Sequence, residues 1–269
     1  KGKLVQLSND TLETRAPQRE VGNLIVGVSR ERYMGEDNWN SPWASDYYLI
    51  NLEDGSNKLV EESGFFGIDL SPSGKRFVVF DNDDQQYYSI EYENESQYKE
   101  ICLTCETKDI IWTDDVNGMP MDASPYGAIA WSEDENQVLL QSRFDIWYYD
   151  YKKDALISLT DGLGKEKGIE LRPKFWANDS VYFHASNTYI EGFDTKTKGT
   201  HLYEIDDHAD HYDVREIAYY DASIIQHTAS KSRTQFLMRK MTFTDYPDLF
   251  TYGNEIGELT AISNANPQQ

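Results

Sequence analysis

A recurring unit of short apolar segments separated by polar turns is the feature that most restricts how this chain can fold. The clearest copy lies between residues 126 and 159. Its four segments are 126–131, 137–141, 145–150 and 155–159. Each is five or six residues long and shows either an alternating or a short continuous apolar pattern, which is typical of β-strands. Four such segments in succession predict a four-stranded sheet.

Other parts of the chain repeat this unit. The copy at 66–90 has a turn at Ser71-Pro72-Ser73-Gly74, where Pro presets φ and Gly supplies a positive φ. A fainter copy lies at 22–28. Two later copies are each predicted as strand, turn and strand, at 174–176, 177–179 and 180–184, and at 217–220, 221–222 and 223–226.

The spacing of the copies predicts a β-propeller. The residues before the turns, Leu70, Trp131, Trp176 and Tyr220, are separated by 61, 45 and 44 residues, and four-stranded propeller blades repeat every 40 to 50 residues or so. A loop at 113–120 explains the long first interval, and further polar connections are expected at 32–40 and 206–213. We therefore expect an all-β chain of about five four-stranded blades or partial blades over residues 1–269. It forms either a closed ring or an incomplete part of a seven- or eight-bladed ring.

Composition agrees with a β-protein and restricts the partners. Aromatic residues make up 13% of the chain, and they suit pleated, half-buried surfaces. Lys plus Arg is 25 against 47 for Asp plus Glu, a formal net charge of -22, which disfavours nucleic acid and anionic membranes as partners and favours cationic or amine-bearing ligands. No apolar run reaches the length of a membrane helix, and no signal peptide opens the sequence. The start at Lys1 suggests a processed precursor or a sequence that begins within a longer protein.

The order of several segments resembles a known family. They are Ser45–Gly55, Leu70–Lys75, Pro125–Gly127 leading to Trp131-Ser132, Arg143–Trp147, Tyr246–Leu249, Leu259-Thr260 and Ser263–Gln268. Together they resemble the propeller of the prolyl oligopeptidase superfamily, in the dipeptidyl peptidase IV and acylaminoacyl peptidase branch and in bacterial members of this type. In that family the Asn-Pro-Gln ending resembles the exit from the last blade toward an α/β-hydrolase domain.

The resemblance implies a role without catalysis for this chain. The family cleaves peptide bonds with a Ser, Asp, His triad whose serine lies in a Gly-x-Ser-x-Gly turn. The nearest match, Gly27–Glu31 around Ser29, lacks the second Gly, so we assign no catalytic residue. The resemblance implies that the propeller caps the active site of a downstream hydrolase domain and filters peptide substrates, in a parent protein that is periplasmic or extracellular.

Two residue pairs invite a functional interpretation, and we favour a structural one for each. Glu61-Glu62 resembles the amine-binding Glu pair of the dipeptidyl peptidase IV branch, but the surrounding residues do not match, and we expect a solvated face. Cys102 and Cys105 lack the second pair of ligands that a zinc site needs. In an extended strand they would point to opposite faces, so we expect a structural role.

The remaining candidates are expected to be ordinary structural residues. The segment 207–211 holds two His and two Asp residues, a set able to surround a metal ion, but polar loops commonly have this composition, and we assign no metal ligand and no cofactor. Residues 81–84 resemble the start of a calcium loop but lack the later Gly and Glu, which favours a hairpin turn. Arg143 and Asp145 either form a buried ion pair or face the central channel, and we favour the pair. His184, His201 and His227 are expected to be surface or core residues.

Three functions stay open from the sequence. The first is the noncatalytic propeller of a serine peptidase. The second is a five-bladed glycosidase with two carboxylates at the channel, and the third is a freestanding protein-binding propeller. A coding sequence that continues past Gln269 into a hydrolase domain would favour the first.

Overall fold

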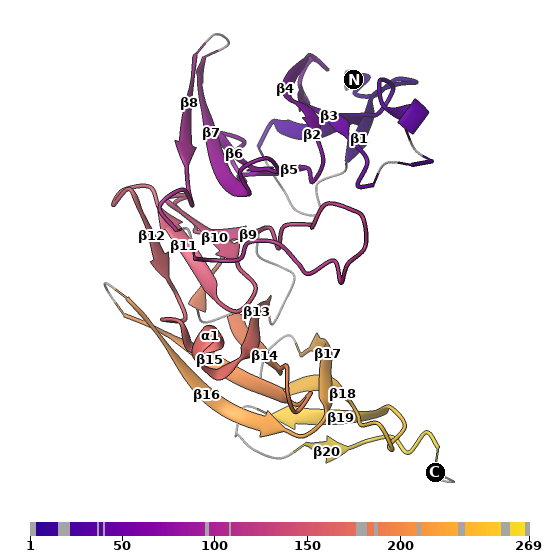
Figure 1. Ribbon diagram of the computed structural model, residues 1–269, viewed down its shortest axis with the longest axis vertical. Helices are drawn as coiled ribbons and strands as arrows, with labels where there is room; N and C mark the ends of the chain where they lie inside the picture. Colours follow the sequence, from indigo (N-terminus) through magenta and orange to yellow (C-terminus); the bar gives the residue numbers. More distant parts are fainter. Residues whose placement is uncertain are drawn as a thin grey trace. The chain divides into compact units, whose positions relative to one another are not determined.

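The computed structural model describes residues 4–15, 22–36, 38–39, 41–94, 97–107, 109–175, 182–185, 188–208, 211–230, 235–253 and 259–266 (Figure 1). Strands dominate this part of the chain, and they form five four-stranded sheets in which the strand order follows the chain. The expectation of an all-β chain with about five four-stranded units is confirmed. None of the described helices is long and apolar enough to cross a membrane.

The chain divides into two compact units, residues 1–142 with 149–156, and residues 143–148 with 157–269. Sheet 1 contains β1 (Glu13–Arg15), β2 (Leu24–Ser29), β3 (Ser45–Asn51) and β4 (Asn57–Gly64), with a 3-10 helix at Met34–Glu36. Sheet 2 contains β5 (Ile68–Leu70), β6 (Arg76–Asp81), β7 (Gln86–Asn94) and β8 (Gln97–Cys102). Sheet 3 contains β9 (Ala128–Trp131), β10 (Gln137–Gln141), β11 (Ile146–Asp150) and β12 (Ala155–Ser158), and the division between the units passes through its last two strands.

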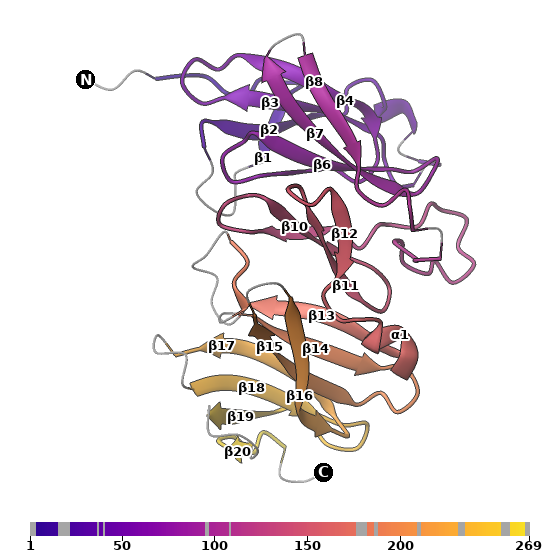
Figure 2. The ribbon, with the colours of Figure 1, turned by 90° about the vertical axis from the view of Figure 1, so that its left-hand side faces the viewer.

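The second unit contains the other two complete sheets (Figure 2). Sheet 4 contains β13 (Ile169–Phe175), β14 (Thr188–Asp194), β15 (Thr200–Asp207) and β16 (Tyr212–Tyr220), preceded by the short helix α1 (Leu163–Lys167). Sheet 5 contains β17 (Ser223–Ala229), β18 (Gln235–Met241), β19 (Asp248–Gly253) and β20 (Thr260–Ala261).

Turn chemistry explains why the predicted strands of sheets 2 and 3 are confirmed. At the Ser71–Gly74 turn, the Ser71 N–H donates to the Arg76 carbonyl and the Gly74 N–H to the Ser71 carbonyl, each at 2.8 Å. Gly74 has a φ of 76°, the left-handed conformation that glycine adopts without a steric cost. The turn therefore returns β5 directly onto β6, with Leu70 opposite Phe77.

Sheets 4 and 5 correct two of the predicted hairpins. The predicted turn at 177–179 and the start of the predicted strand 180–184 lie outside the described residues, and the described partner of β13 is β14, with Phe175 opposite Thr188. The predicted hairpin around Asp221-Ala222 is wrong, because β16 closes sheet 4 and β17 opens sheet 5. In the sequence, a short polar link that joins two paired strands cannot be told from one that joins two successive sheets.

Contacts between sheets in the first unit are both polar and aromatic. The guanidinium of Arg76 on β6 lies 4.5 Å from the ring centroid of Tyr151, after β11. The Tyr151 hydroxyl donates to Ser89 Oγ on β7 at 2.7 Å, and its ring is parallel to that of Trp131. Together these contacts hold sheet 2 against sheet 3 around one cation–π pair.

In the second unit, a threonine links sheets 4 and 5. Thr200 Oγ1 on β15 donates to the Ala222 carbonyl at 2.9 Å and accepts from the Ile224 N–H at 3.2 Å. Thr200 is buried, and the sheet 5 core beside it consists of Ala222, Ile224, Phe236, Met238 and Tyr252. This link positions the sheet that carries the candidate site.

Candidate functional site

A pocket lies at one end of sheet 5, where the β18–β19 turn meets the segment that follows β20. Its volume is about 340 Å³. Its described lining consists of Lys240, Met241, Thr242, Asp245, Tyr246, Asp248, Phe250, Asn264 and Asn266. We call it the C-terminal pocket.

Thr242 shapes the turn on one side of this pocket. Its Oγ1 accepts from the Asp245 N–H at 2.9 Å and donates to Asp245 Oδ2 at 2.9 Å. Such hydroxyl-to-backbone bonds stabilise a tight turn. The two large side chains of this turn, Phe243 and Tyr246, are left exposed, so the rim of the pocket presents aromatic surface to solvent.

Asp248 connects the turn to the terminal segment. Its Oδ1 accepts from Ser263 Oγ at 2.6 Å and from the Ala265 N–H at 2.8 Å. Ser263 Oγ in turn accepts from the Leu249 N–H at 2.8 Å. Two of the segments that carry the family resemblance, Tyr246–Leu249 and the described part of Ser263–Gln268, are therefore hydrogen-bonded to each other.

The chemistry of the pocket suits binding. Lys240 supplies an ammonium group, which lies 5.7 Å from the Phe250 ring centroid, and Asp245 supplies a carboxylate. None of the described lining residues is a histidine, so the Thr242 hydroxyl has no imidazole base there to activate it. Mixed charges, amides and exposed aromatic rings are the composition of a polar protein interface.

Comparison with known proteins identifies the fold. A puromycin hydrolase has a TM-score of 0.50 at 12% identity, over 91% of this chain and 38% of that one. This chain is a β-propeller. The β-propeller domain of the Trilobed protease from Pyrococcus furiosus has a TM-score of 0.48 at 12% identity, over 94% of this chain and 72% of that one. The acylaminoacyl peptidase of Pyrococcus horikoshii has a TM-score of 0.49 at 14% identity, over 95% of this chain and 40% of that one.

These neighbours are propeller-containing peptidases of the prolyl oligopeptidase family. The propeller chain spans less than half the length of the puromycin hydrolase and of the acylaminoacyl peptidase. No protein-family model and no curated protein sequence matches it. At 12% identity the puromycin hydrolase match bears on the fold alone, and the five four-stranded sheets of the described residues agree with a propeller.

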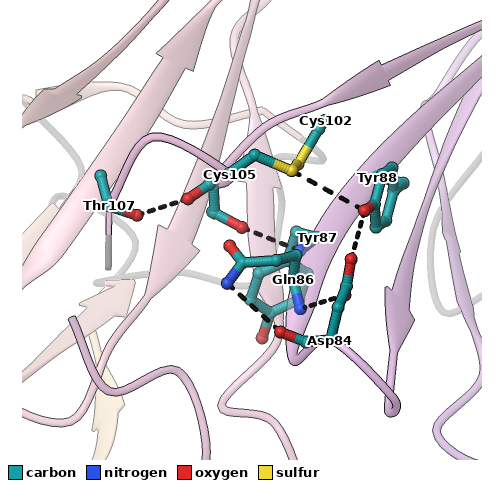
Figure 3. The surroundings of a disulfide bond; sticks show 8 residues. Asp84, Gln86, Tyr87, Tyr88, Cys102, Cys105 and Thr107 are labelled. Atoms are coloured by element: carbon teal, nitrogen blue, oxygen red, sulfur yellow. Dashed lines mark hydrogen bonds between the residues drawn. A yellow bond between two sulfur atoms is a disulfide. The ribbon is translucent and has the colours of Figure 1, made fainter. Parts of the chain in front are cut away.

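The two cysteines form a disulfide, Cys102–Cys105 (Figure 3). The expectation that they point to opposite faces of a strand is wrong, because β8 ends at Cys102 and the chain bends over the next residues. The bend is attached to β7, where Thr104 Oγ1 accepts from the Tyr87 N–H and the Leu103 N–H donates to the Tyr87 carbonyl. Cys105 Sγ also lies 3.7 Å from the Tyr88 hydroxyl. The two cysteines are therefore paired with each other by a covalent bond.

Ser29 and the Glu61-Glu62 pair lie in sheet 1. Ser29 is the last residue of β2 and is paired with Asp46 of β3, so it lies in a regular sheet rather than in a strand-to-helix turn. Glu62 is exposed and forms an ion pair with Arg32. Glu61 is half-buried, and burial, followed by the charges of nearby carboxylates, raises its pKa.

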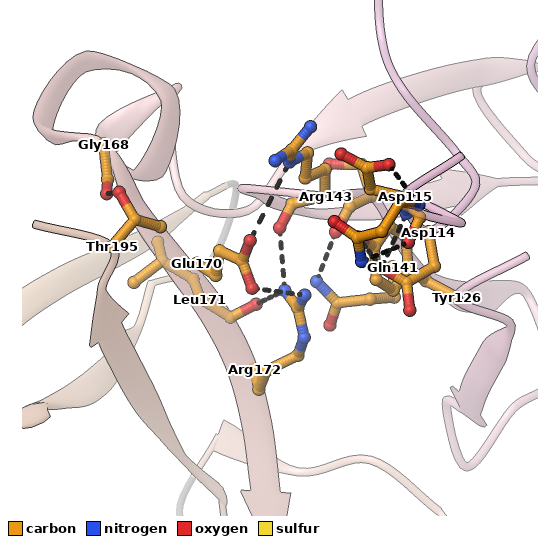
Figure 4. Close-up of polar contacts among 12 residues, drawn as sticks. Asp114, Asp115, Tyr126, Gln141, Arg143, Gly168, Glu170, Leu171, Arg172 and Thr195 are labelled. Carbon is orange, nitrogen blue, oxygen red and sulfur yellow. Dashed lines mark hydrogen bonds and ion pairs between the residues drawn. The ribbon is translucent and has the colours of Figure 1, made fainter. Parts of the chain in front are cut away.

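Arg143 and Asp145 have separate partners in the second unit, and Figure 4 shows Arg143 beside Glu170 and Arg172. Arg143 Nε lies 3.8 Å from Glu170 Oε1, and Glu170 Oε2 lies 3.3 Å from Arg172 Nη2. Arg172 also donates to the Arg143 carbonyl at 2.9 Å. The predicted Arg143–Asp145 pair is therefore replaced by a pair with Glu170. Asp145 is buried, and it accepts hydrogen bonds instead from the start of α1.

The other predicted polar segments have clear positions. Residues 81–84 form the β6–β7 turn, in which Asp81 Oδ1 accepts from the Asp83 N–H at 2.8 Å, and the interpretation as a hairpin turn is confirmed. His201 on β15 is half-buried, and its ring contacts those of Tyr203 and Tyr219. His184 precedes sheet 4 strand β14 and is half-buried. The side chain of His227, on β17, lies outside the described set.

Asp69 on β5 is a carboxyl that the sequence did not single out. Crowding by protein atoms raises its pKa from 3.8 to about 6, although its carboxylate accepts a hydrogen bond from the Ala128 N–H. No pattern in the sequence distinguishes it, because Ala128, the residue that bonds it, lies on β9 of another sheet. Part of the residue is open to solvent, so water screens much of the electrostatic cost.

The substitution Asp69→Asn is expected to stabilise the propeller more at neutral pH than in acid. The folded state binds the Asp69 proton more tightly than the unfolded state does, so the stability that protonated Asp69 contributes to the unsubstituted protein is complete below about pH 4 and is lost as the pH rises through about 6. Asparagine stays neutral and still accepts from Ala128. Urea unfolding at roughly pH 4 and pH 7 should show a gain of about 1 kcal/mol at the higher pH only. A gain of equal size for Asp83→Asn, in the exposed β6–β7 turn, would contradict this cause.

Proposed function

We propose that this chain is the noncatalytic propeller region of a serine peptidase. In this role it caps the active site of a hydrolase domain of the same polypeptide and filters peptide substrates by size. The propeller fold supports the proposal, as does the family resemblance of segments in the order expected. The observation that carries it is the junction at Asp248, which joins two of those segments next to the C-terminal pocket.

The exposed rim of the C-terminal pocket fits a contact with that hydrolase domain. Phe243 and Tyr246 expose 106% and 53% of their surface, and exposed aromatic groups with a polar surround mark protein interaction sites. The family exit toward the hydrolase domain follows the same terminal segment. The partner we propose for this surface is therefore the hydrolase domain, and peptides are the substrates of the whole protein.

The disulfide supports the cellular location that we propose. Disulfides such as Cys102–Cys105 persist in oxidising compartments and are rare where thiols are kept reduced. A periplasmic or extracellular parent protein accounts for this bond.

The glycosidase alternative has less support. A glycosidase of the usual kind places two carboxyl groups within about 10 Å of each other, one of them with a raised pKa. Asp69 and Glu61 both have a raised pKa, and burial is the first cause for each. The resemblance of segments in the expected order supports the peptidase propeller and gives no support to a glycosidase.

The test uses the protein encoded by the complete gene. We expect the coding sequence to continue past Gln269 into a Gly-x-Ser-x-Gly domain whose serine reacts with a fluorophosphonate probe. Short chromogenic peptides should be cleaved at least tenfold faster than the same sequence within a folded protein. A stop codon directly after Gln269, or hydrolysis of aryl glycosides without serine labelling, would refute the proposal.

The contact surface is tested in the same protein with the double variant Phe243→Asp/Tyr246→Asp. If this rim contacts the hydrolase domain, the variant should lose selectivity against large substrates while its serine still reacts with the probe. The matched control is Phe193→Asp, at an exposed aromatic position on β14. If the double variant and the control showed the same selectivity against large substrates, the rim would not be the surface that contacts the hydrolase domain.

A further inference from the structure

The tip of the β15–β16 hairpin brings two histidines together. Asp207, the last residue of β15, is paired with Tyr212, the first of β16. Beyond this pair the His208 N–H donates to the His211 carbonyl at 3.0 Å. The hydrogen bond holds the two residues across the tip, and their rings stack with centroids 4.7 Å apart and an interplanar angle of 20°.

A carboxylate completes the cluster. Asp213 on β16 places Oδ2 3.1 Å from His208 Nε2 and 3.7 Å from His211 Nε2. All three candidate ligand atoms lie within 4.8 Å of one another. Ligand atoms around a tetrahedral zinc ion, each about 2.1 Å from it, are roughly 3.4 Å apart. The two distances to Asp213 bracket this value, so small side-chain rotations would bring the ligand set around an ion.

The surroundings favour a cation that water can deliver. The side chains of His208, His211 and Asp213 are 47%, 57% and 64% exposed, so the ligands are accessible to a hydrated ion. The chain has a formal net charge of -22, which raises the local concentration of cations. An ion pair between Asp213 and a protonated His208 would account for the 3.1 Å distance between them. It would not account for the stacking of His211 on His208.

We propose that His208, His211 and Asp213 form a binding site for a divalent transition metal of the zinc class. Two imidazoles and one carboxylate form a donor set that suits zinc, copper and nickel, whereas calcium and magnesium prefer oxygen ligands. Three protein ligands leave a coordination position for water or for a donor from a partner. The bound ion would tie β15 to β16 at their exposed end, and the site is independent of the proposed peptidase role.

Calorimetric titration of the untagged 269-residue chain with ZnCl₂, after chelator treatment, tests the site. We expect binding of one ion per chain, with retention in millimolar CaCl₂. His208→Ala, His211→Ala and Asp213→Asn should each weaken binding at least tenfold. His184→Ala and Asp221→Asn, which remove the same groups elsewhere in the second unit, should leave it unchanged.

A second measurement identifies the ligands directly. Cobalt(II) bound to the site should show visible absorption bands of a four- or five-coordinate ion, and these should disappear in the His208→Ala/His211→Ala variant. Circular dichroism should be the same for all variants, because the three side chains are at an exposed tip. Zinc binding that survives the double variant, or no binding to the unsubstituted chain at micromolar concentrations, would overturn the proposal.

Discussion

Replacing Asp145 by alanine is expected to lower the free energy of unfolding by about 3 kcal/mol. The buried carboxylate accepts hydrogen bonds from Thr160 Oγ1 at 2.8 Å, from the Gly164 N–H at 2.9 Å and from the Lys165 N–H at 3.1 Å. The last two donors belong to the first turn of α1, whose N-cap residue, Gly162, has no side chain to bond them. Asp145 therefore caps this helix from a distant position in the chain, and its removal leaves buried donors without an acceptor.

Chemical denaturation of Asp145→Ala, Asp145→Asn and Glu166→Ala measures this effect. Asparagine keeps one acceptor oxygen, so its cost should be intermediate. Glu166 is an exposed carboxylate on α1 itself, and its removal should change stability by less than about 0.5 kcal/mol. A loss below 1 kcal/mol for Asp145→Ala, on the order of a single exposed hydrogen bond, would show that solvent replaces these bonds.

Three strands of sheet 2 and the four strands of sheet 3 were predictable, because they are short apolar segments separated by polar turns. At Ser71–Gly74 the pattern sets both the place and the conformation of the turn, and the neighbouring apolar segments have one obvious pairing. The link at Asp221-Ala222 has no such feature, since its length fits a hairpin as well as a connection between sheets. Only the pairing of β16 with β15 over its whole length, from Thr200 and Tyr220 to Asp207 and Tyr212, decides against the hairpin.

The candidate sites depend on contacts that local sequence does not record. Cys102 and Cys105 are brought together by the end of β8, and strand boundaries are the least certain part of a sequence-based prediction. The two histidines and Asp213 are close in the sequence, but their convergence depends on the hydrogen bond across the hairpin tip. In the C-terminal pocket, the junction at Asp248 joins residues that are 15 apart along the chain. The family resemblance singled out both segments, but nothing in the sequence indicated that they are in contact.

Contact between sheets 2 and 3 depends strongly on Glu135, and Glu135→Ala is expected to cost about 2 kcal/mol. Glu135 is 9% exposed, in the turn between β9 and β10. Its Oε1 accepts from the Ser73 N–H at 2.7 Å, and its Oε2 accepts from Ser73 Oγ at 2.6 Å. These are charge-assisted bonds to the Ser-Pro-Ser-Gly turn of the preceding sheet, and such bonds are stronger than neutral ones.

A double-mutant cycle with Ser73→Ala separates this contact from other effects of the substitution. If the carboxylate acts through Ser73, the double variant should cost less than the sum of the two single variants, with a coupling of about 1 kcal/mol. The backbone bond from Ser73 would be lost only with Glu135→Ala, so that variant should remain the costlier single change. Glu133→Ala, at an exposed position in the same turn, serves as the control and should have little effect. Additive costs would show that the Ser73 hydroxyl does not contribute, and the contact would then depend on the bond from the Ser73 backbone N–H.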